Sequence, residues 1–548
     1  MHMESQVEEG NRLLLNDEPA KARAVYEQVL ESRSCPLDVA AALDHNTAVA
    51  LEMEGRFREA LELYSRNVNG PRVPLPTKVR SMVGMANCLR HQHSFCRSID
   101  VLCNAAELAP YHVQTHMLLS SAMIRRNHVE EACQAMFIGL VFVKDTMAVE
   151  TNNFAQCYYE PLNGSVYYMR TGCATSLDVL YCERFKEADI LAFHKSRLPQ
   201  LRFREQPRVV YVSEHFHKGS VMSNVLPLLR NHGTAFGVVS LGNIRDDVHA
   251  QVRSLGSLFF DGCLPAGIRF DVAVCCDGHT GRRAALRLLA ERNISDVVID
   301  CFGYPFSTGQ PAVTHKLVDS LTDPPDAESH YTERLVRLDP CFLTWQPLID
   351  DPSPMDRIRA YAPDEHAHRV LAPNNFKKLS KTCVRLYRKL LQSNENISLF
   401  FKSVSHEAAQ FQDFFEEGFS EFGGRVALLS APDDTSEHYD LTASYDVVVD
   451  AFPYNGTITT LESMWCGVPV VSLAGHSHRA RVGASILSAV GMPENLTRDC
   501  QSFCTAVNRL LEMKSARQHE LVHRALTASC IMQHEQYARR FVDALSAL

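Results

Sequence analysis

The stretch that decides the fold is Asp450-Ala-Phe-Pro-Tyr-Asn-Gly-Thr-Ile-Thr-Thr-Leu-Glu-Ser463. It follows residues 445–449, a β-branched apolar run that is typical of a buried strand. A turn rich in Pro, Asn and Gly leads into a predicted helix over 457–467, and a second predicted strand, 468–473, follows at once. N–H groups at such a helix start face the carboxyl edge of the sheet and suit a phosphate or diphosphate. An ordinary βαβ unit with a Thr cap fits the same residues.

The composition is that of a globular protein with several domains. With 548 residues the chain is too long for one hydrophobic core, so about three or four domains are expected. A net charge of −9 without an evident basic stripe argues against nucleic-acid binding. The 18 cysteines are scattered without paired CxxC motifs, which favours reduced thiols in the cytoplasm or nucleus. We recognise no signal peptide and no apolar run of membrane-spanning length, so no membrane partner is expected.

Residues 5–145 are predicted to form tetratricopeptide repeats. In each repeat of about 34 to 38 residues a small residue stands twelve positions before a second small residue, and a large side chain follows four later. The sets are Gly10, Ala22 and Tyr26; Ala48, Ala60 and Tyr64; Ala86, Ser98 and Leu102; and Ser120, Ala132 and Met136. The alternative is a helical bundle without repeats. A short solenoid has a concave face that suits protein segments, so we expect protein or peptide acceptors along this arm.

The rest of the chain is predicted to be α/β. Residues 146–205 are expected to form a linker with inter-domain helices, 206–365 an N-terminal Rossmann-like half and 366–548 a C-terminal Rossmann-like half that binds a nucleotide-sugar. Within these, residues 310–368 are expected to be irregular. The predicted strands are 208–213, 237–241, 270–276, 296–300, 369–371, 397–401, 425–429, 445–449 and 468–473. Because parallel sheets bind ligands at the carboxyl ends of their strands, the site is expected in a cleft between the two halves.

Polar loops follow several of these strands, where functional residues concentrate. They are residues 213–220, 277–281, 303–309 and 374–381. Each loop alone is explained as well by a cap, a surface turn or a solvated helix face. Together they gather at the carboxyl edges of two sheets. One adjacent Asp pair at 433–434 is weak support for a metal, so no metal site is predicted.

These residues resemble the SPINDLY and O-GlcNAc transferase family. The resemblance covers about residues 207–545 and is carried by the stretch 450–463 and by further runs. These runs are Cys466-Gly-Val-Pro-Val-Val-Ser-Leu-Ala-Gly475, His478-Arg-Ala-Arg-Val-Gly-Ala-Ser485, Gly303-Tyr-Pro-Phe-Ser-Thr-Gly309, Asp319-Ser-Leu-Thr-Asp-Pro-Pro-Asp326 and Tyr331-Thr-Glu-Arg-Leu-Val-Arg-Leu338. It implies an α-helical TPR solenoid followed by an α/β GT-B glycosyltransferase of two Rossmann-like domains. The implied enzyme is inverting and metal-independent, needs no cofactor beyond its donor, and modifies Ser and Thr hydroxyls of nuclear and cytoplasmic proteins.

The resemblance also implies roles for single residues. Lys381 matches the catalytic lysine of the family and is expected to contact the donor diphosphate. His279 and Thr280 match a Gly-His-Thr loop near the sugar and the acceptor. The remaining matches to donor-binding positions are His438, Gly456, Thr457, Ile458, Thr459 and Glu462. Of these, Glu462 is expected to bind the ribose, and His438 to lie near the base and ribose.

The chain departs from the family pattern in the loop after its first strand. The family has a His where this chain has Gly219, while His215 and His217 stand a few residues earlier. Three consequences are open: His217 takes the vacant place as a catalytic residue, no general base is used, or the activity is impaired. The last alternative makes the chain a non-catalytic scaffold whose repeats bind partners.

A second departure concerns the donor. O-GlcNAc transferases usually carry His and Asp at the positions of Thr457 and Glu462. The residues of this chain, with Phe452-Pro-Tyr454 before them, resemble the SPINDLY branch, which uses GDP-fucose. Protein O-fucosylation is therefore the first hypothesis, and transfer from UDP-GlcNAc is the alternative. Whether two copies form a homodimer is left open.

Overall fold

The computed structural model describes residues 2–31, 35–126, parts of 128–139 and most of 208–548. Outside the description lie residues 1, 32–34, 127, 129–130, 133, 136–137, 140–207, 266, 281–283, 309, 311, 350, 352, 376–377, 404–414, 417, 431 and 433. The predicted linker over 146–205 and the repeat position Met136 are therefore outside the described residues. The chain divides into two compact units, Met1–Val143 and Lys144–Leu548.

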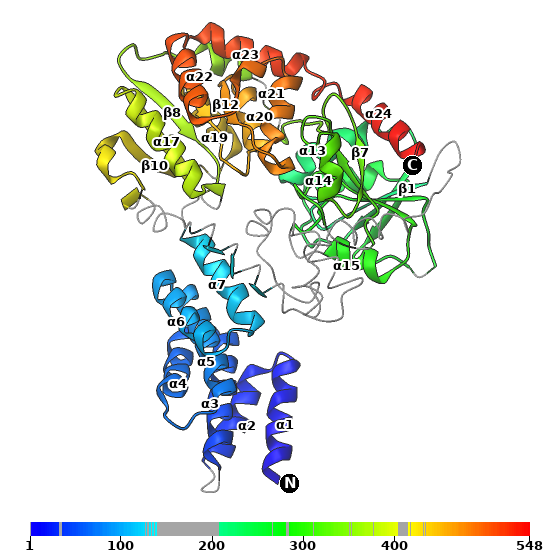
Figure 1. Ribbon diagram of the computed structural model, residues 1–548. Helices are drawn as coiled ribbons and strands as arrows, with labels where there is room; N and C mark the ends of the chain where they lie inside the picture. Colours follow the sequence, from blue (N-terminus) through cyan, green and yellow to red (C-terminus); the bar gives the residue numbers. More distant parts are fainter. Residues whose placement is uncertain are drawn as a thin grey trace. The chain divides into compact units, whose positions relative to one another are not determined.

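The first unit consists of helices that pack against their neighbours in the chain (Figure 1). They are α1 (His2–Leu15), α2 (Pro19–Leu30), α3 (Leu37–Met53), α4 (Phe57–Asn69), α5 (Leu75–His91), α6 (Phe95–Leu108) and α7 (Val113–Arg125). The turns between paired helices contain residues with positive φ, namely Asp17, Gly55 and His93. Such a conformation ends one helix within a few residues and lets the next begin.

The small residues of the sequence pattern lie where paired helices approach closely. A Cβ atom on Gly10 would come within 2.3 Å of the Tyr26 ring, so only glycine fits there. Ser98 is fully buried and its hydroxyl donates to the carbonyl of Ala86 at 3.0 Å. The other described members of the pattern are buried as well: Ala22, Ala48, Ala60, Tyr64, Leu102, Ser120 and Ala132. The predicted tetratricopeptide-like repeat is confirmed, because close helix contacts need small residues at these positions.

The second unit contains two parallel sheets. The N-terminal sheet has the strand order β3-β2-β1-β4-β5-β6-β7, and the C-terminal sheet has the order β10-β9-β8-β11-β12-β13. The strands of the first are β1 (Val209–Ser213), β2 (Phe236–Ser240), β3 (Leu258–Asp261), β4 (Val272–Cys275), β5 (Val297–Asp300), β6 (His315–Val318) and β7 (Arg334–Arg337). Those of the second are β8 (His368–Ala372), β9 (Ile397–Ser403), β10 (Val426–Ser430), β11 (Val447–Val449), β12 (Val470–Leu473) and β13 (Leu496–Thr497). All pairs are parallel, which confirms two Rossmann-like halves.

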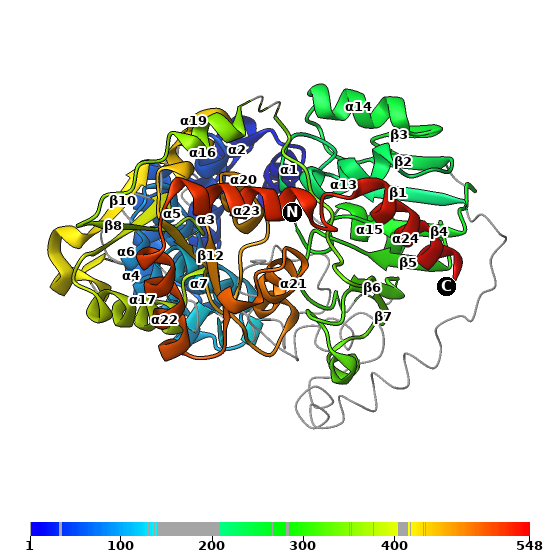
Figure 2. The ribbon, with the colours of Figure 1, turned by 90° about the horizontal axis from the view of Figure 1, so that it is seen from above.

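Helices cover both sheets and join them (Figure 2). The helices are α13 (Ser220–Arg230), α14 (Asp247–Leu255), α15 (Ala284–Glu291), α16 (Pro354–Arg359), α17 (Lys381–Ser393), α19 (Thr435–Ala443), α20 (Ile458–Trp465), α21 (Val482–Ala489), α22 (Cys500–Glu512), α23 (Ala516–Ala528) and α24 (His534–Ser546). Among the described residues, short 3₁₀ segments accompany them at Pro325–His330, Ser420–Arg425, His478–Ala480 and Pro493–Asn495. The chain end crosses between the halves, since α23 packs on α20 and α24 packs on α13.

The prediction that residues 310–368 are irregular was wrong, because this segment supplies β6, β7 and the short helix α16. Lys316 on β6 is fully buried and contacts the carboxylate of Asp300 and the carbonyl of Tyr304. A charged residue inside a four-residue strand breaks the apolar run by which buried strands are recognised. The two-residue strand β13 was missed because it is too short to show a pattern. The edge strand β3, Leu-Phe-Phe-Asp with both ends exposed, was missed as well.

Apolar packing and buried hydrogen bonds both join the two halves. One core cluster of buried side chains extends from β1 and α13 to α20 and α24. Asp323 of the N-terminal half accepts from Tyr331 at 2.7 Å and pairs with His478 of the C-terminal half at 2.6 Å. The hydroxyl of Ser485 donates to Asp319 at 2.5 Å between the same two halves. These buried contacts fix the relative position of the two sheets.

In the described part of the chain no helix is both long and apolar enough to cross a bilayer.

Candidate active site

The strand order of each sheet reverses at one point, and that point positions the site. In the N-terminal sheet β1 lies between β2 and β4, and in the C-terminal sheet β8 lies between β9 and β11. The connections on either side of such a point run in opposite directions and leave a crevice at the carboxyl edge. The described loop residues there are 214–219 and 276–280 in the first sheet, and 373–375, 378–380 and 450–457 in the second. They contain most of the candidate residues predicted from the sequence.

Asp450 organises the loop after β11. Its side chain is almost fully buried, and one carboxylate oxygen accepts from the amide of Asn374 at 3.1 Å and from the N–H groups of Ala451 at 2.8 Å and Gly456 at 2.6 Å. The other oxygen accepts from the hydroxyl of Ser472 at 2.7 Å. Burial raises the pKa of Asp450 to about 6, and these donors act in the opposite direction. The carboxylate therefore closes the loop on itself and presents the start of α20.

The start of α20 is open to a ligand. Thr457 stands at the N-cap position but makes no capping hydrogen bond with its side chain in the described structure, contrary to the alternative of a simple Thr cap. The first helical bond runs from the N–H of Leu461 to the carbonyl of Thr457, so the preceding N–H groups lie outside the helical ladder. A Cβ atom on Gly456 would lie 2.3 Å from Oγ1 of Thr459. The close approach at Gly456 keeps this turn tight, and the exposed N–H groups suit an anion.

Lys381 is the first residue of α17 and is exposed. The preceding residue, Ser380, caps the helix by accepting from the N–H of Cys383 at 3.1 Å. Its hydroxyl also donates to the carbonyl of Phe452 at 2.7 Å. The start of α17 is therefore tied to the loop that leads into α20. Two helix starts and a lysine are thus neighbours at the same switch point.

His438 and Glu462 are brought together by α19 and α20. Nε2 of His438 lies 3.6 Å from the Glu462 carboxylate, and both side chains are largely buried. The ammonium of Lys402 lies 2.8 Å from Nδ1 of His438 and 3.3 Å from its Nε2. Burial lowers the pKa of Lys402, whereas the charge of Glu462 raises it. Lys402 was missed by the sequence analysis; its signal is a lysine that follows the apolar run Leu399-Phe400-Phe401 near the end of strand β9.

A cavity of about 320 Å³ lies between the two halves. The N-terminal half lines it with Lys218, Gly219, Ser220 and Ser223, the linking segment with residues 345–349, and the C-terminal half with Thr435, Tyr439, Ile458, Thr459 and Glu462. The donor-binding candidates Ile458, Thr459 and Glu462 therefore face the position where the family pattern has a His. Lys218 and Ser220 are further lining residues that sequence reasoning did not select.

Gly219 has room for a side chain. Its φ of 167° is ordinary extended backbone, and a Cβ atom there would come no closer than 3.9 Å to His217. His217 itself is half-buried and its Nδ1 lies 3.1 Å from the carbonyl of Lys218. His217 is not among the residues that line the cavity. In this structure, therefore, its imidazole does not fill the vacant place beside Gly219.

Asp277 ties the two loops of the N-terminal switch point together. It is fully buried, and its oxygens accept from the hydroxyl of Ser213 at 2.5 Å and the N–H of Glu214 at 2.7 Å. Burial raises the pKa of Asp277 to about 8. Ligand atoms of Glu214, His215 and Asp277 lie within 4.8 Å of one another, close enough to hold a metal ion. Both Asp277 oxygens are already hydrogen-bonded within the protein. These hydrogen bonds explain why Asp277 lies beside Glu214.

His279 and Thr280 contact the loop after β5 rather than the cavity. His279 is fully buried, with Nε2 2.7 Å from the carbonyl of Thr308 and its ring against Tyr304. The hydroxyl of Thr280 donates to the carbonyl of Gly303 at 2.5 Å. Neither residue lines the cavity between the halves. Their position indicates that they shape the 303–308 loop.

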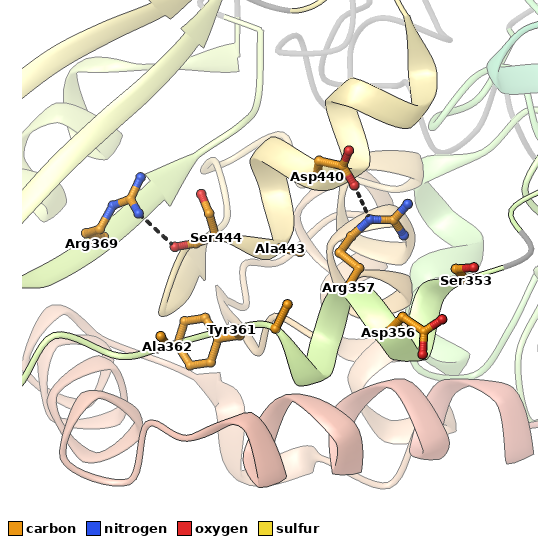
Figure 3. A pocket seen from close by; sticks show the side chains of 10 residues that line it. Ser353, Asp356, Arg357, Tyr361, Ala362, Arg369, Asp440, Ala443 and Ser444 are labelled. Carbon is orange, nitrogen blue, oxygen red and sulfur yellow. Dashed lines mark hydrogen bonds and ion pairs between the residues drawn. The ribbon is translucent and has the colours of Figure 1, made fainter.

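A larger cavity, of about 560 Å³, lies at the opposite edge of the C-terminal sheet (Figure 3). Arg369, which lines it, is the second residue of β8 and donates to the carbonyl of Ser444 at 3.1 Å. Arg357 lines it too and donates to Asp440 at 2.6 Å. This cavity lies at the amino ends of the strands, away from both switch points. Parallel sheets bind their ligands at the carboxyl ends, which favours the smaller cavity as the active site.

Comparison with known proteins gives a consistent result. A family described as glycosyl transferase family 41 matches residues 377–541. A probable UDP-N-acetylglucosamine–peptide N-acetylglucosaminyltransferase SPINDLY of Arabidopsis thaliana is 32% identical over 227 residues, which are 41% of this chain and 24% of the relative. A protein of the same description named SEC, also from Arabidopsis thaliana, is 22% identical over 238 residues, 41% of this chain and 23% of the relative. The matched regions span about a quarter of the length of these curated relatives.

One solved structure resembles nearly the whole chain. It is a mutant of the O-GlcNAc transferase of Thermobaculum terrenum, which matches with a TM-score of 0.65 and 19% identity over 93% of this chain and 98% of that chain. At this identity the likeness concerns the fold. It agrees with helical repeats followed by two Rossmann-like halves in the GT-B arrangement.

Proposed function

Because this chain belongs to the SPINDLY and O-GlcNAc transferase family, we propose that it is a protein O-glycosyltransferase. It transfers one sugar, with inversion, from a nucleotide diphosphate donor to a Ser or Thr hydroxyl. The observation that carries the proposal is the cavity between the halves, in which the loop around Gly219 faces Ile458, Thr459 and Glu462 of α20. An open helix start at a switch point is where a diphosphate binds in α/β proteins.

The proposed reaction is a direct displacement at the anomeric carbon of the donor sugar. The acceptor hydroxyl attacks the anomeric carbon, the bond from that carbon to the phosphate oxygen breaks, and the nucleotide diphosphate leaves with the electron pair. Its negative charge is stabilised by Lys381 and by N–H groups of Thr457, Ile458 and Thr459, with Gly456 keeping the turn close. This set of donors makes a metal ion unnecessary, so we propose a reaction without metal or cofactor.

The other candidates have supporting roles in the proposal. Glu462 binds the donor ribose, and His438 lies beside it near the base and ribose, with Lys402 next to the imidazole. His279 and Thr280 support the 303–308 loop at the sugar end of the site. His217, two residues before Gly219, accepts the proton of the acceptor hydroxyl, directly or through a water.

The preferred donor is GDP-fucose. Thr457 and Glu462 support it, because they stand where the GlcNAc-type pattern has His and Asp. UDP-GlcNAc is the second candidate donor, and the relatives of Arabidopsis thaliana favour it, since they are described as probable UDP-N-acetylglucosamine–peptide N-acetylglucosaminyltransferases. The acceptors are protein segments bound along the helical repeats, in the cytoplasm or nucleus. A homodimer of the chain is compatible with this arrangement.

Nucleotide binding tests the donor site directly. We expect isothermal titration to show GDP binding about tenfold tighter than UDP, and Lys381→Ala to weaken GDP binding without changing the melting temperature. UDP binding tighter than GDP would reverse the donor assignment, and binding of neither nucleotide would contradict the proposal. Protein treated with EDTA should bind GDP unchanged. A loss that Mn²⁺ restores would contradict the metal-free reaction and direct attention to Glu214, His215 and Asp277.

A further inference from the structure

Lys378 connects the two loops of the C-terminal switch point. It lies between β8 and α17, and its ammonium donates to the carbonyl of Asn455 in the loop after β11 at 3.1 Å. The same ammonium lies 4.1 Å from the centroid of the Tyr454 ring. A cation held over an aromatic face and a carbonyl at once has two attractive partners. These contacts fix the direction of both the carbonyl and the ring.

The contacts of Lys378 belong to a continuous row of contacts between residues 378–380 and residues 452–455, which are parts of the two loops. Leu379 forms an antiparallel bridge with Pro453, and the hydroxyl of Ser380 donates to the carbonyl of Phe452. Residues 378–380 therefore run along residues 452–455 in opposite direction. Lys378 makes the contact of this row that is nearest to α20, through the carbonyl of Asn455. Because the Asn455 carbonyl and the Gly456 N–H belong to one planar peptide group, fixing the carbonyl fixes the N–H that precedes the helix.

The Tyr454 ring reaches the other half of the unit. It packs against Tyr304 and Phe306, which are both almost fully buried. Tyr304 is in turn held by the buried Lys316, which donates to its carbonyl. The ammonium of Lys378 thus supports an aromatic cluster, Tyr304, Phe306 and Tyr454, that joins the 303–308 loop to the start of α20.

We propose that Lys378 is a positioning residue of the donor site. Through Asn455 and Tyr454 it holds the turn at Gly456 and the start of α20 in the form that accepts a nucleotide diphosphate. The inference rests on the proposed function and names a residue that the family resemblance does not assign. It follows that a cation is needed at this position, since a neutral side chain of equal length keeps neither the cation–π contact nor the charge-assisted hydrogen bond.

The test compares Lys378→Met and Lys378→Arg in the full chain by titration with GDP and with UDP. We expect Lys378→Met to lose about tenfold in affinity for the nucleotide that wild type prefers, which is typical for one charge-assisted hydrogen bond. Lys378→Arg should stay within about twofold, because arginine keeps the cation over the ring. The matched control is Lys389→Met, an exposed lysine of the same helix region, which should bind as wild type.

Steady-state kinetics separate positioning from general damage. In Lys378→Met the donor KM should rise about tenfold while the acceptor KM is unchanged. If Lys378→Met fails to fold, Lys378→Gln replaces it, because its side chain is polar and removes the charge. Unchanged affinity in the neutral variant, or equal losses in the neutral and Arg variants, would overturn the role of Lys378 and leave the proposed function standing. Absence of nucleotide binding by wild type would overturn both.

Discussion

The carboxylate of Glu462 lies 3.6 Å from Nε2 of His438, and the opposite nitrogen of that imidazole accepts from Lys402 at 2.8 Å. An acid, an imidazole and an ammonium thus form a chain between β9, α19 and α20. Glu462 also lines the cavity between the halves. The chain fixes its carboxylate at the wall of that cavity, which is what recognition of a pair of sugar hydroxyls requires.

Replacement of Glu462 by Gln should weaken donor binding. The amide keeps the shape of the side chain but loses the charge that accepts hydroxyl donors and that supports the charged form of Lys402. We expect the donor KM to rise about tenfold, with a smaller change in kcat. The control is Glu512→Gln at the exposed end of α22, which should leave both constants unchanged. Equal donor KM values for wild type and Glu462→Gln would remove Glu462 from the site.

Gly456→Ala should disrupt the donor site through a steric clash. The added methyl group would lie 2.3 Å from Oγ1 of Thr459 and 3.0 Å from Oδ1 of Asn374, so the turn must open. We expect a loss of nucleotide affinity of more than about tenfold, together with a destabilisation of about 1 to 3 kcal/mol, which denaturant titration measures. Gly424→Ala, whose methyl group meets nothing within 4 Å, is the matched control. Wild-type affinity in Gly456→Ala would show that the close approach is irrelevant to binding.

The sequence predicted the order of helices and strands better than it predicted the contacts between side chains. Strands such as Val209–Ser213 and Val470–Leu473 are uniformly buried, and parallel burial leaves an apolar run that is visible in sequence. The strand His315–Val318 was missed because its buried Lys316 is neutralised by Asp300, which comes from another strand. Such tertiary pairing has no local signal.

The same reason separates the predicted from the unpredicted site residues. Thr459 and Glu462 were selected because the stretch 450–463 resembles the donor-binding segment of the family, and such a resemblance is visible in the sequence. Lys402 and Lys378 act through partners 36 and 77 residues away, His438 and Asn455, and only the folded chain brings these together. Conversely, the resemblance implied a place near the sugar and the acceptor for His279, whereas its side chain is fully buried and contacts the carbonyl of Thr308.

Gly219→His should increase transfer. The backbone at Gly219 is extended and has open space beside it, so the change should alter stability by no more than about 0.5 kcal/mol. An imidazole there would border the cavity, which His217 does not line, and would take the hydroxyl proton in place of His217. A well-placed base raises rates by about 10² to 10⁴. The measurement is kcat for fucose transfer, with Gly219→Ala as the control for added bulk. A kcat for Gly219→His no higher than that of Gly219→Ala would show that no base acts at this position.

The raised pKa of Asp450 predicts that the stability of the protein depends on pH. Its pKa of about 6 in the folded protein is above the ordinary value, so between about pH 4 and pH 6 the folded protein binds more protons than the unfolded chain. The free energy of unfolding should therefore fall by about 3 kcal/mol through this carboxyl as pH rises across that window, and stay level above it. Denaturant titrations of wild type and Asp450→Asn at several pH values measure the difference. Parallel pH profiles of the two proteins would contradict the assigned pKa.

The central claim is that the cavity between the halves transfers a sugar to protein hydroxyls. The most direct measurement is the intact mass of a Ser/Thr-rich acceptor protein after incubation with the full chain and either GDP-fucose or UDP-GlcNAc, with Lys381→Ala as the control. The account predicts the gain of a deoxyhexose with GDP-fucose and no gain with Lys381→Ala. A gain of N-acetylhexosamine instead would assign the alternative donor. An acceptor of unchanged mass with both donors, or full transfer by Lys381→Ala, would contradict the account.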